Sequence, residues 1–339
     1  MKRIITIIMA IIMVLVLALS IAACDLNLEA LEGLKDAADE RTTRTPASNP
    51  TPPPDTPPPD IPFTPVEDFE YSLDAQTQGV KITAYTGMSF NIRIPEEIQG
   101  QPVTVINGLS TELLTVELPN TLKVIGGSAF KNCKSLTNII IPDSVESINF
   151  NAFENCELLT SVIIGNGVIT IGQKAFLNCK SLTSIVIPDS VESIGHEAFK
   201  NCRSLSSVII GNGVKGIDSG AFEYCVSLTS IIIPDSVESI GNGAFAFCES
   251  LTSVTIGNGV TVIYKRAFWY CESLTSVTLG DNVKTIAEEA FANCKSLKSI
   301  NIPDSVANIA QGAFRTLYDI LLPVETIEKI LNIELTAFW

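Results

Sequence analysis

The hydrophobic positions of the chain recur with a period of 23 residues over most of its length. One unit reads LTSIVIPDSVESIGHEAFKNC, residues 182–202. Its first six residues predict a half-buried strand, and the proline that follows predicts the end of that strand. The segment SIGHEAFKNC spaces its apolar residues as on one face of a short helical turn. We therefore expect one set of side chains to point inward in each unit: Leu182, Ile185, Ile187, Val191, Ile194, Phe199 and Cys202.

Cysteine and phenylalanine mark each unit. The cysteines follow one another at intervals of 23 residues, and a phenylalanine lies three residues before each of them. A further unit keeps Phe314 but has Leu317 where cysteine is due, so this position accepts a plain hydrophobic residue. We expect these residues to form the structural core: Cys133, Cys156, Cys179, Cys202, Cys225, Cys248, Cys271 and Cys294, with Phe130, Phe153, Phe176, Phe199, Phe222, Phe245, Phe268, Phe291 and Phe314.

A unit this short buries its apolar residues only by stacking on its neighbours, which predicts a solenoid. We expect the α/β class, with a parallel β-sheet on one face and short helical turns or loops on the other. The repeat pattern becomes irregular towards both ends, as is typical of terminal caps. The pattern assigns residues 66–118 to an N-terminal cap and irregular repeats, 119–316 to regular repeats and 317–339 to a C-terminal cap.

The N-terminus has the pattern of an export signal. Lys2 and Arg3 precede an apolar run that ends in IAAC, residues 21–24. This ending resembles the bacterial lipobox, which implies a lipoprotein signal peptide over residues 1–23 and an acylated Cys24. An ordinary cleaved signal peptide and an uncleaved anchor helix are the alternatives. With more than one acyl chain, Cys24 would anchor the protein stably to a membrane.

Proline dominates the segment that follows. Ten of the twenty residues in PASNPTPPPDTPPPDIPFTP, residues 46–65, are proline. Such a segment cannot pack a core, and it extends as polyproline II at about 3.1 Å per residue. We interpret residues 24–65 as the acylated cysteine and a disordered stalk that holds the following domain away from the membrane. A proline-rich ligand for a recognition domain is the alternative.

The charge of the chain excludes one class of partner. The formal net charge is −15, from 22 basic and 37 acidic residues. Nucleic-acid binding needs clustered lysine and arginine, so we expect no nucleic-acid partner.

The repeat units resemble the BspA-like class of leucine-rich repeats, whose units have the form L-T-S-I-x-I-P-x-x-V-x-x-I-x-x-x-A-F-x-x-C. The resemblance covers about residues 85–325. It implies a leucine-rich repeat solenoid and a place on a bacterial or protist cell surface, where members serve as adhesins and host-contact proteins. It carries over no catalytic residue, because the family shares none.

Two cysteines and the single histidine of the chain, His196, lie within residues 179–202, which raises the question of a metal, redox or catalytic site. A zinc site needs ligands that converge on one point, whereas these cysteines form a column along the core. Free buried thiols are the main interpretation, and disulfides between adjacent coils are the alternative. His196 belongs to a column of exposed positions without a recurring residue type, while Cys202 faces the core. We therefore expect no metal, no cofactor and no enzymatic activity.

An apolar column on the outer face of the predicted strands is the first candidate binding surface. A column of mostly serine lies beside it. Successive β-branched residues that face water form a patch of the kind that marks interaction sites. The alternative is that β-branched residues simply suit strands. The column consists of Ile140, Ile163, Val186, Ile209 and Ile232.

Aromatic residues supply the second candidate surface. The position just before each cysteine is asparagine in most units but aromatic in three consecutive ones. Aromatic clusters anchor interfaces and stack against sugars. The alternative is that these rings pack over the edge of the core. The candidate residues are Tyr224, Phe247 and Tyr270, with Trp269 and Tyr264 nearby.

The sequence as a whole predicts a lipid-anchored, exported protein of the bacterial cell envelope, monomeric and exposed at the cell surface. Its expected function is protein–protein or host-matrix adhesion through the solenoid surface. The alternative is a structural, envelope-organising or glycan-binding module without a specific protein ligand.

Overall fold

A computed structural model of the chain describes residues 61–109, 112–297 and 299–315. The predicted signal peptide, Cys24, most of the proline-rich segment and the C-terminal cap at 317–339 lie outside these residues. Within them, no helix has the length and apolar character needed to cross a membrane.

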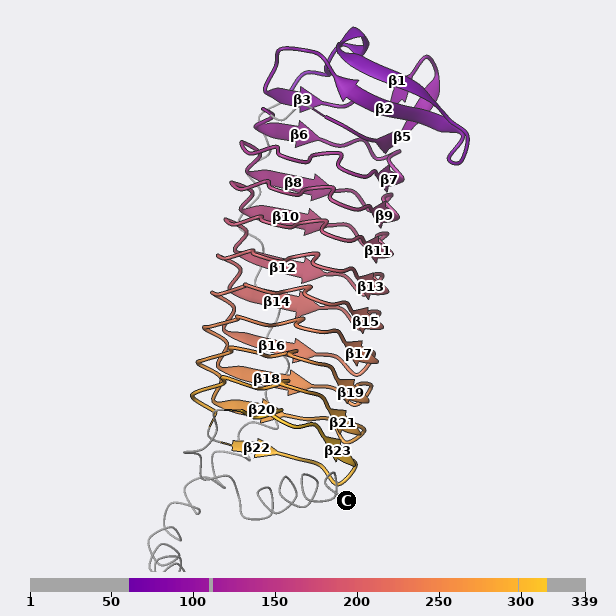
Figure 1. Cartoon of the computed structure of the whole chain (residues 1–339). Helices are drawn as coiled ribbons and strands as arrows, with labels where there is room; N and C mark the ends of the chain where they lie inside the picture. Colours follow the sequence, from indigo (N-terminus) through magenta and orange to yellow (C-terminus); the bar gives the residue numbers. More distant parts are fainter. Residues whose placement is uncertain (1–60, 110–111, 298, 316–339) are drawn as a thin grey trace, which may run out of the picture. The chain divides into compact units, whose positions relative to one another are not determined.

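The repeats stack on one another as successive coils, and each regular coil contributes one strand to each of two faces (Figure 1). The longer strands lie along one face: β3 (Asn91–Arg93), β6 (Thr115–Glu117), β8 (Asn138–Ile141), β10 (Ser161–Ile164), β12 (Ser184–Ile187), β14 (Ser207–Ile210), β16 (Ser230–Ile233), β18 (Ser253–Ile256), β20 (Ser276–Thr278) and β22 (Ser299–Asn301). These strands pair in four separate groups, β3 with β6, β8 with β10, β12 with β14, and β16 to β22. Within a group the pairing is parallel and in register, residue i with residue i+23 in the regular coils, for example Ser184 with Ser207.

A second set of strands forms a continuous parallel ladder on the other face; apart from β5, these strands are two residues long and are called the short strands. They are β5 (Gln101–Ile106), β7 (Val124–Ile125), β9 (Ser147–Ile148), β11 (Thr170–Ile171), β13 (Ser193–Ile194), β15 (Gly216–Ile217), β17 (Ser239–Ile240), β19 (Val262–Ile263), β21 (Thr285–Ile286) and β23 (Asn308–Ile309). The segment SIGHEAFKNC was expected to form a helical turn, but its first two residues are strand β13 and residues 196–201 form hydrogen-bonded turns.

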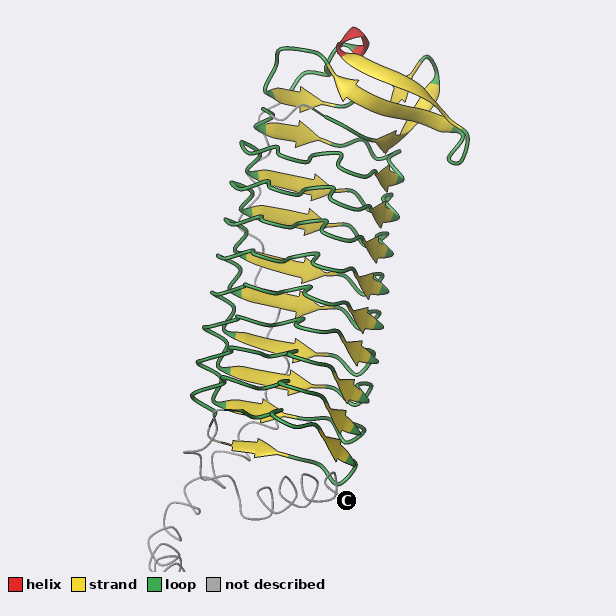
Figure 2. Cartoon of the chain, in the orientation of Figure 1, coloured by secondary structure: helices red, strands yellow, loops and turns green. Residues whose placement is uncertain are grey.

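The described residues contain no α-helix; their single helical element is the 3-10 turn η1 (Val66–Asp68), as Figure 2 shows. The predicted solenoid with parallel strands is confirmed; helical turns are a minor component, and loops and turns take their place in the described residues. The backbone explains why. Glu197 and Asn201 have φ of 54° and 62°, the left-handed region that interrupts a right-handed helix.

Backbone hydrogen bonds on the turn face alternate between two kinds of partner. The Phe199 amide donates to the Ala221 carbonyl of the next coil at 2.7 Å, whereas the Lys200 amide donates to the Glu197 carbonyl three residues back at 3.2 Å. A helix would use all of these amides within one coil. Here half of them join one coil to the next, so the turn face is a third ladder.

The core follows the sequence pattern. All seven side chains expected to point inward in the 182–202 unit are 2% exposed or less. The phenylalanines from Phe130 to Phe314 form one continuous stack, with ring centroids 4.9–5.5 Å apart and planes within 7° of parallel. Offset stacking of aromatic rings adds about 0.5–1.5 kcal/mol per pair to the area that the rings bury.

An antiparallel cap closes the N-terminal end of the short-strand sheet. Strands β1 (Phe69–Asp74) and β2 (Gly79–Tyr85) form a hairpin, and β2 pairs in parallel with β5. Strand β4 (Glu97–Ile98) adds an antiparallel pair to β5.

Proline coils and glycine coils alternate and fit each other closely. Where one coil has Pro188 and Asp189, the next has Gly211 and Gly213. A Cβ on Gly211 would lie 2.5 Å from the Pro188 carbonyl carbon, and one on Gly213 would overlap the Asp189 carbonyl oxygen. The Asp189 carboxylate accepts the Asn212 amide at 2.6 Å. The glycine coil therefore packs directly against the backbone of the proline coil.

This packing predicts that Gly213→Ala lowers the free energy of unfolding by about 1–3 kcal/mol, the usual cost of forcing an extra group into a filled space. The control is Gly216→Ala, because a Cβ there would meet nothing closer than the Ser239 hydroxyl at 3.7 Å. Urea denaturation measures both variants. Equal midpoints for the two would contradict the close packing.

Candidate binding surfaces

The outer face of the long strands carries three columns of side chains, which we call the uncharged face because none of their residues is charged. They are a threonine column (Thr137, Thr160, Thr183, Ser206, Thr229, Thr252, Thr275), a serine column (Asn138, Ser161, Ser184, Ser207, Ser230, Ser253, Ser276) and a ridge (Ile140, Ile163, Val186, Ile209, Ile232, Thr255, Thr278). All are exposed or half-buried.

The five apolar residues at the start of the ridge project into water. The residues before and after each of them in the strand are buried, whereas the five themselves are 46–70% exposed: Ile140, Ile163, Val186, Ile209 and Ile232. Successive residues belong to consecutive coils, whose strands lie about 4.8 Å apart where they pair, as β8 does with β10 and β12 with β14. The ridge is therefore one continuous apolar line about 20 Å long, which is the first surface expected from the sequence.

Hydroxyl groups of the threonine column are already hydrogen-bonded within the fold. The Thr160 hydroxyl donates to the Thr137 carbonyl at 2.9 Å, and the Thr252 hydroxyl donates to the Thr229 carbonyl at 2.9 Å. The hydroxyls of Thr183, Ser206, Thr229 and Thr275 bond to the preceding coil in the same way. The column thus fixes the edge of the uncharged face, a role that the sequence analysis did not identify.

The aromatic column occupies a strained backbone position. Residues just before the cysteines have φ near 60° in every regular coil, and asparagine suits this left-handed conformation. Four asparagines form a side-chain ladder there, in which the Asn178 side-chain amide donates to the Asn155 side-chain oxygen at 2.7 Å. Tyr224, Phe247 and Tyr270 adopt the same conformation, at a cost of about 1–2 kcal/mol each.

Stacking compensates for this strain. The rings of Tyr224 and Phe247 stack with centroids 4.4 Å apart, and those of Phe247 and Tyr270 with centroids 5.1 Å apart. Trp269 meets Phe247 and Tyr270 edge to face, at 4.8 and 4.7 Å, and the Arg266 guanidinium lies 4.7 Å from the Trp269 centroid. The faces of the central ring are therefore occupied by its neighbours and are not available to stack on a sugar.

Tyr264 lies outside this aromatic stack. Its side chain is 42% exposed and makes no ring-to-ring contact among the residues that the structure describes. The structure thus joins four of the five predicted aromatic residues and leaves Tyr264 separate.

The cysteines are core residues in the structure. All eight are fully buried. Each thiol from Cys156 to Cys294 donates to the carbonyl of a phenylalanine in the preceding coil, as Cys202 does to Phe176 at 3.3 Å. Burial raises the pKa of Cys202 to about 12. In the described part of the chain, no group of cysteine, histidine and carboxylate side chains converges as metal ligands would.

His196 is partly exposed, and its ring forms a hydrogen bond to the next coil. Its Nδ1–H donates to the Ser219 carbonyl of the next coil at 2.8 Å, and its Nε2 lies 3.9 Å from the Glu197 carboxylate. Cys202, by contrast, is in the core and bonds to a carbonyl there. The histidine and the thiol do not form a catalytic couple.

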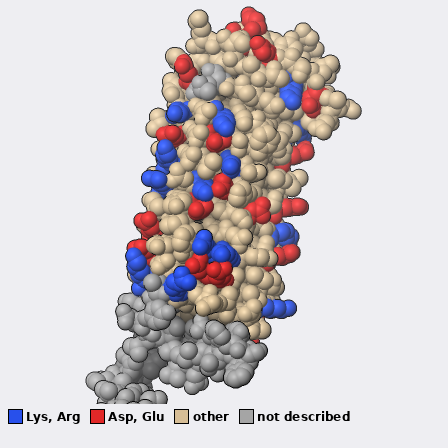
Figure 3. Space-filling model, viewed as in Figure 1, with Lys and Arg blue, Asp and Glu red and all other residues tan. Residues whose placement is uncertain are grey.

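Charged residues away from the uncharged face pair between coils. Figure 3 shows acidic and basic side chains next to each other along the length of the solenoid. Lys200, for example, contacts Glu197 at 2.8 Å and Glu223 at 2.9 Å. Pairing of this kind leaves no concentrated positive patch for an anionic partner in the described residues.

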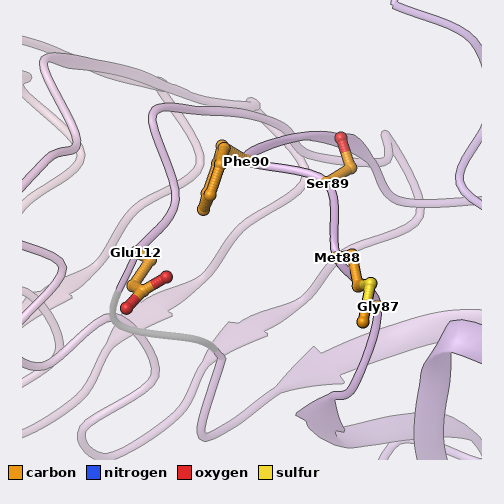
Figure 4. A pocket seen from close by; sticks show the side chains of 5 residues that line it. All are labelled: Gly87, Met88, Ser89, Phe90 and Glu112. Atoms are coloured by element: carbon orange, nitrogen blue, oxygen red, sulfur yellow. The ribbon is translucent and has the colours of Figure 1, made fainter.

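A shallow hollow lies near the N-terminal cap, with a volume of about 440 Å³. Figure 4 shows its lining residues, Gly87, Met88, Ser89, Phe90 and Glu112. One titratable side chain, Glu112, contributes to it, so the hollow offers no acid–base pair and no set of metal ligands.

Comparison with known proteins identifies the repeat type. A model of the BspA-type leucine-rich repeat region, in six copies, matches residues 109–229 and 215–339. A leucine-rich cell surface protein from Faecalibacterium prausnitzii is 27% identical, with 76% of this chain and 86% of that chain covered and a TM-score of 0.52. A T. pallidum leucine-rich repeat protein is 29% identical over 69% of this chain and 90% of its own, with a TM-score of 0.45. No curated protein matches significantly.

Thiol accessibility tests the assignment of the cysteines to the core. We expect a maleimide reagent to leave the eight cysteines of the solenoid unmodified in the native chain and to modify all eight after denaturation without reductant, because burial blocks access and suppresses the thiolate. Mass spectrometry of peptides reads each site. Failure of the denatured chain to react would instead indicate disulfides.

The aromatic stack predicts unequal effects of two matched substitutions. Phe247→Asn relieves backbone strain but loses three ring contacts, so it lowers the free energy of unfolding by about 1–2 kcal/mol. Tyr224→Asn loses one ring contact and extends the asparagine ladder, so its effect is close to zero. Chemical denaturation compares them. A Phe247→Asn variant more stable than the parent would show that the ring contacts do not offset the backbone strain.

Proposed function

The chain belongs to the BspA-type leucine-rich repeat family, and from this premise we propose that it is a lipid-anchored cell-surface protein that adheres to another protein through its uncharged face. This family is a repeat scaffold rather than an enzyme class. A repeat scaffold presents equivalent positions of successive coils as one extended surface, which is how solenoids bind proteins.

The observation that carries the proposal is the apolar ridge. Its five residues, Ile140 to Ile232, stay exposed in consecutive coils, and no charged residue interrupts the face around them. Charged residues are also depleted at the centre of protein–protein interfaces. A purely structural coil has no need to keep this line apolar, because the polar residues Thr255 and Thr278 fill the same position in later coils.

Surface exposure has separate support. The Faecalibacterium prausnitzii relative is described as a cell surface protein. The lipobox-like IAAC at residues 21–24 and the proline-rich segment that follows support an anchor and a stalk. Together these features favour a domain held at a distance from a membrane and available to partners outside the cell.

A structural, envelope-organising module is the second candidate function. The aromatic stack favours it, since Tyr224, Phe247 and Tyr270 use their ring faces on one another rather than on a ligand.

Binding measurements on charge variants of the ridge test the proposed surface. The double variant Val186→Glu with Ile209→Glu places two carboxylates at the centre of the ridge. We expect it to weaken capture of matrix or host proteins on the full chain by at least about tenfold, because each buried carboxylate costs more than 1.4 kcal/mol.

The control variant is Ile169→Glu, which adds a carboxylate at an apolar residue that is 43% exposed but lies off the uncharged face. It should bind as the parent does. Loss of binding in both variants, or in neither, would contradict the proposed surface, and absence of any ligand for the parent would favour the structural role.

The anchor is tested through Cys24. Cells that express the parent and incorporate a labelled fatty acid should yield a labelled, membrane-associated protein. In Cys24→Ala the label should be absent and the protein should appear in the soluble fraction. Retention of the label in this variant would contradict acylation at Cys24.

A further inference from the structure

The uncharged face is complementary in shape to itself. Alternate residues of a strand lie on the same face about 7 Å apart, so the ridge and the serine column run side by side along the solenoid. The first five ridge residues end in branched apolar groups, whereas serine extends only one hydroxymethyl group from the backbone. We call the serine column the serine groove because its side chains are shorter than those of the ridge beside it, and both repeat once per coil.

We propose that the uncharged face packs against the same face of a second copy of this chain, with the ridge of each copy lying in the serine groove of the other. The inference rests on the proposed function and names the protein ligand of that surface.

Symmetry decides how the two copies would be oriented. A face-to-face pair of identical surfaces is related by a two-fold axis in the plane of contact. An axis along the solenoid, midway between the two columns, places Val186 of one copy opposite Ser184 of the other. An axis along the strands instead places ridge against ridge and leaves both grooves empty. The fit therefore selects the first arrangement, in which both solenoids run in the same direction.

Two copies that run in the same direction have their N-terminal ends on the same side. This is the orientation of two chains anchored by Cys24 in one membrane. The proposed pair is thus formed by neighbours on one cell and does not bridge two cells.

The absence of charge favours self-contact through this face. Each chain has a formal net charge of −15, so contact through most other surfaces brings carboxylates together. The three columns of the uncharged face contain no charge. Where the ridge column continues into the N-terminal cap it holds Arg93 and Glu117, which pair within the chain at 3.4 Å.

The size of the face predicts a weak pair. Seven coils at about 4.8 Å, and a width of about 10 Å from the threonine column to the ridge, bury on the order of 700 Å² in total, which is below the size of stable specific interfaces. Such a pair dissociates in dilute solution, in agreement with the monomer expected from the sequence. Confinement to a membrane raises the effective concentration and favours the pair.

Cross-linking on vesicles tests this geometry. Val186→Cys introduces an exposed thiol on the ridge of a chain whose eight solenoid cysteines are buried. The control is Ile169→Cys, an exposed position off the face. With the full acylated chain in neutral lipid vesicles, a short bismaleimide should cross-link a mixture of Val186→Cys and Ser184→Cys chains at least about fivefold more than Ile169→Cys chains. Adding Ile209→Glu to both chains of the mixture should abolish this excess.

Flotation of the same vesicles separates the two proposals. If the chain floats and the excess cross-linking is absent, self-contact through this face is wrong while the anchor stands. If the chain does not float, the anchor is wrong, and the same reaction in concentrated solution then decides whether the faces meet. If the mixture of Val186→Cys and Ser184→Cys chains cross-links no more than Ile169→Cys chains, on vesicles or in concentrated solution, the inference is overturned.

Discussion

Hydrogen bonds between the backbones of successive coils are the interaction on which the rest of this structure depends. A coil of 23 residues is too short to satisfy its own amides and carbonyls or to bury its own apolar side chains. It does both through its neighbours, along the long strands, the short strands and the turns. Because all three ladders have the same period, identical residues stack on one another, and every column of the fold is a consequence of that spacing.

The columns also explain which residues stabilise the fold and which remain available to bind a partner. Inside, phenylalanine rings stack and cysteine thiols donate to phenylalanine carbonyls of the preceding coil. At the edges, asparagine amides and threonine hydroxyls bond along their columns. The ridge of the uncharged face is different, since its apolar side chains have no such partner and face water. We therefore expect this protein to bind its partner through an exposed column whose side chains do not hydrogen-bond or stack along the solenoid.

The sequence pattern was sufficient to predict the period, the parallel strands and the buried set, because burial in a solenoid follows directly from which positions repeat as apolar. It was not sufficient for the turn face. The spacing of Ile194, Ala198, Phe199 and Cys202 resembles a helical turn, but left-handed residues at Glu197 and Asn201 direct alternate amides to the next coil. The recurring asparagine before each cysteine was the available signal for that conformation.

The same limit applies to the candidate surfaces. The exposed ridge followed from strand alternation, whereas the stacking of Tyr224, Phe247 and Tyr270 on one another depends on side-chain orientation at a left-handed backbone, which spacing alone does not specify. The lipid anchor lies in a part of the chain that the structure does not describe, and it stays a prediction of the IAAC motif.

Hydrogen–deuterium exchange of the turn-face amides tests the central claim most directly. If the third ladder joins the coils, the amides of Phe153, Phe176, Phe199 and Phe222 exchange as slowly as those of strands β10 to β16. Fast exchange of these amides, with the strands still protected, would contradict the account and would show that the turns are not part of what holds the coils together.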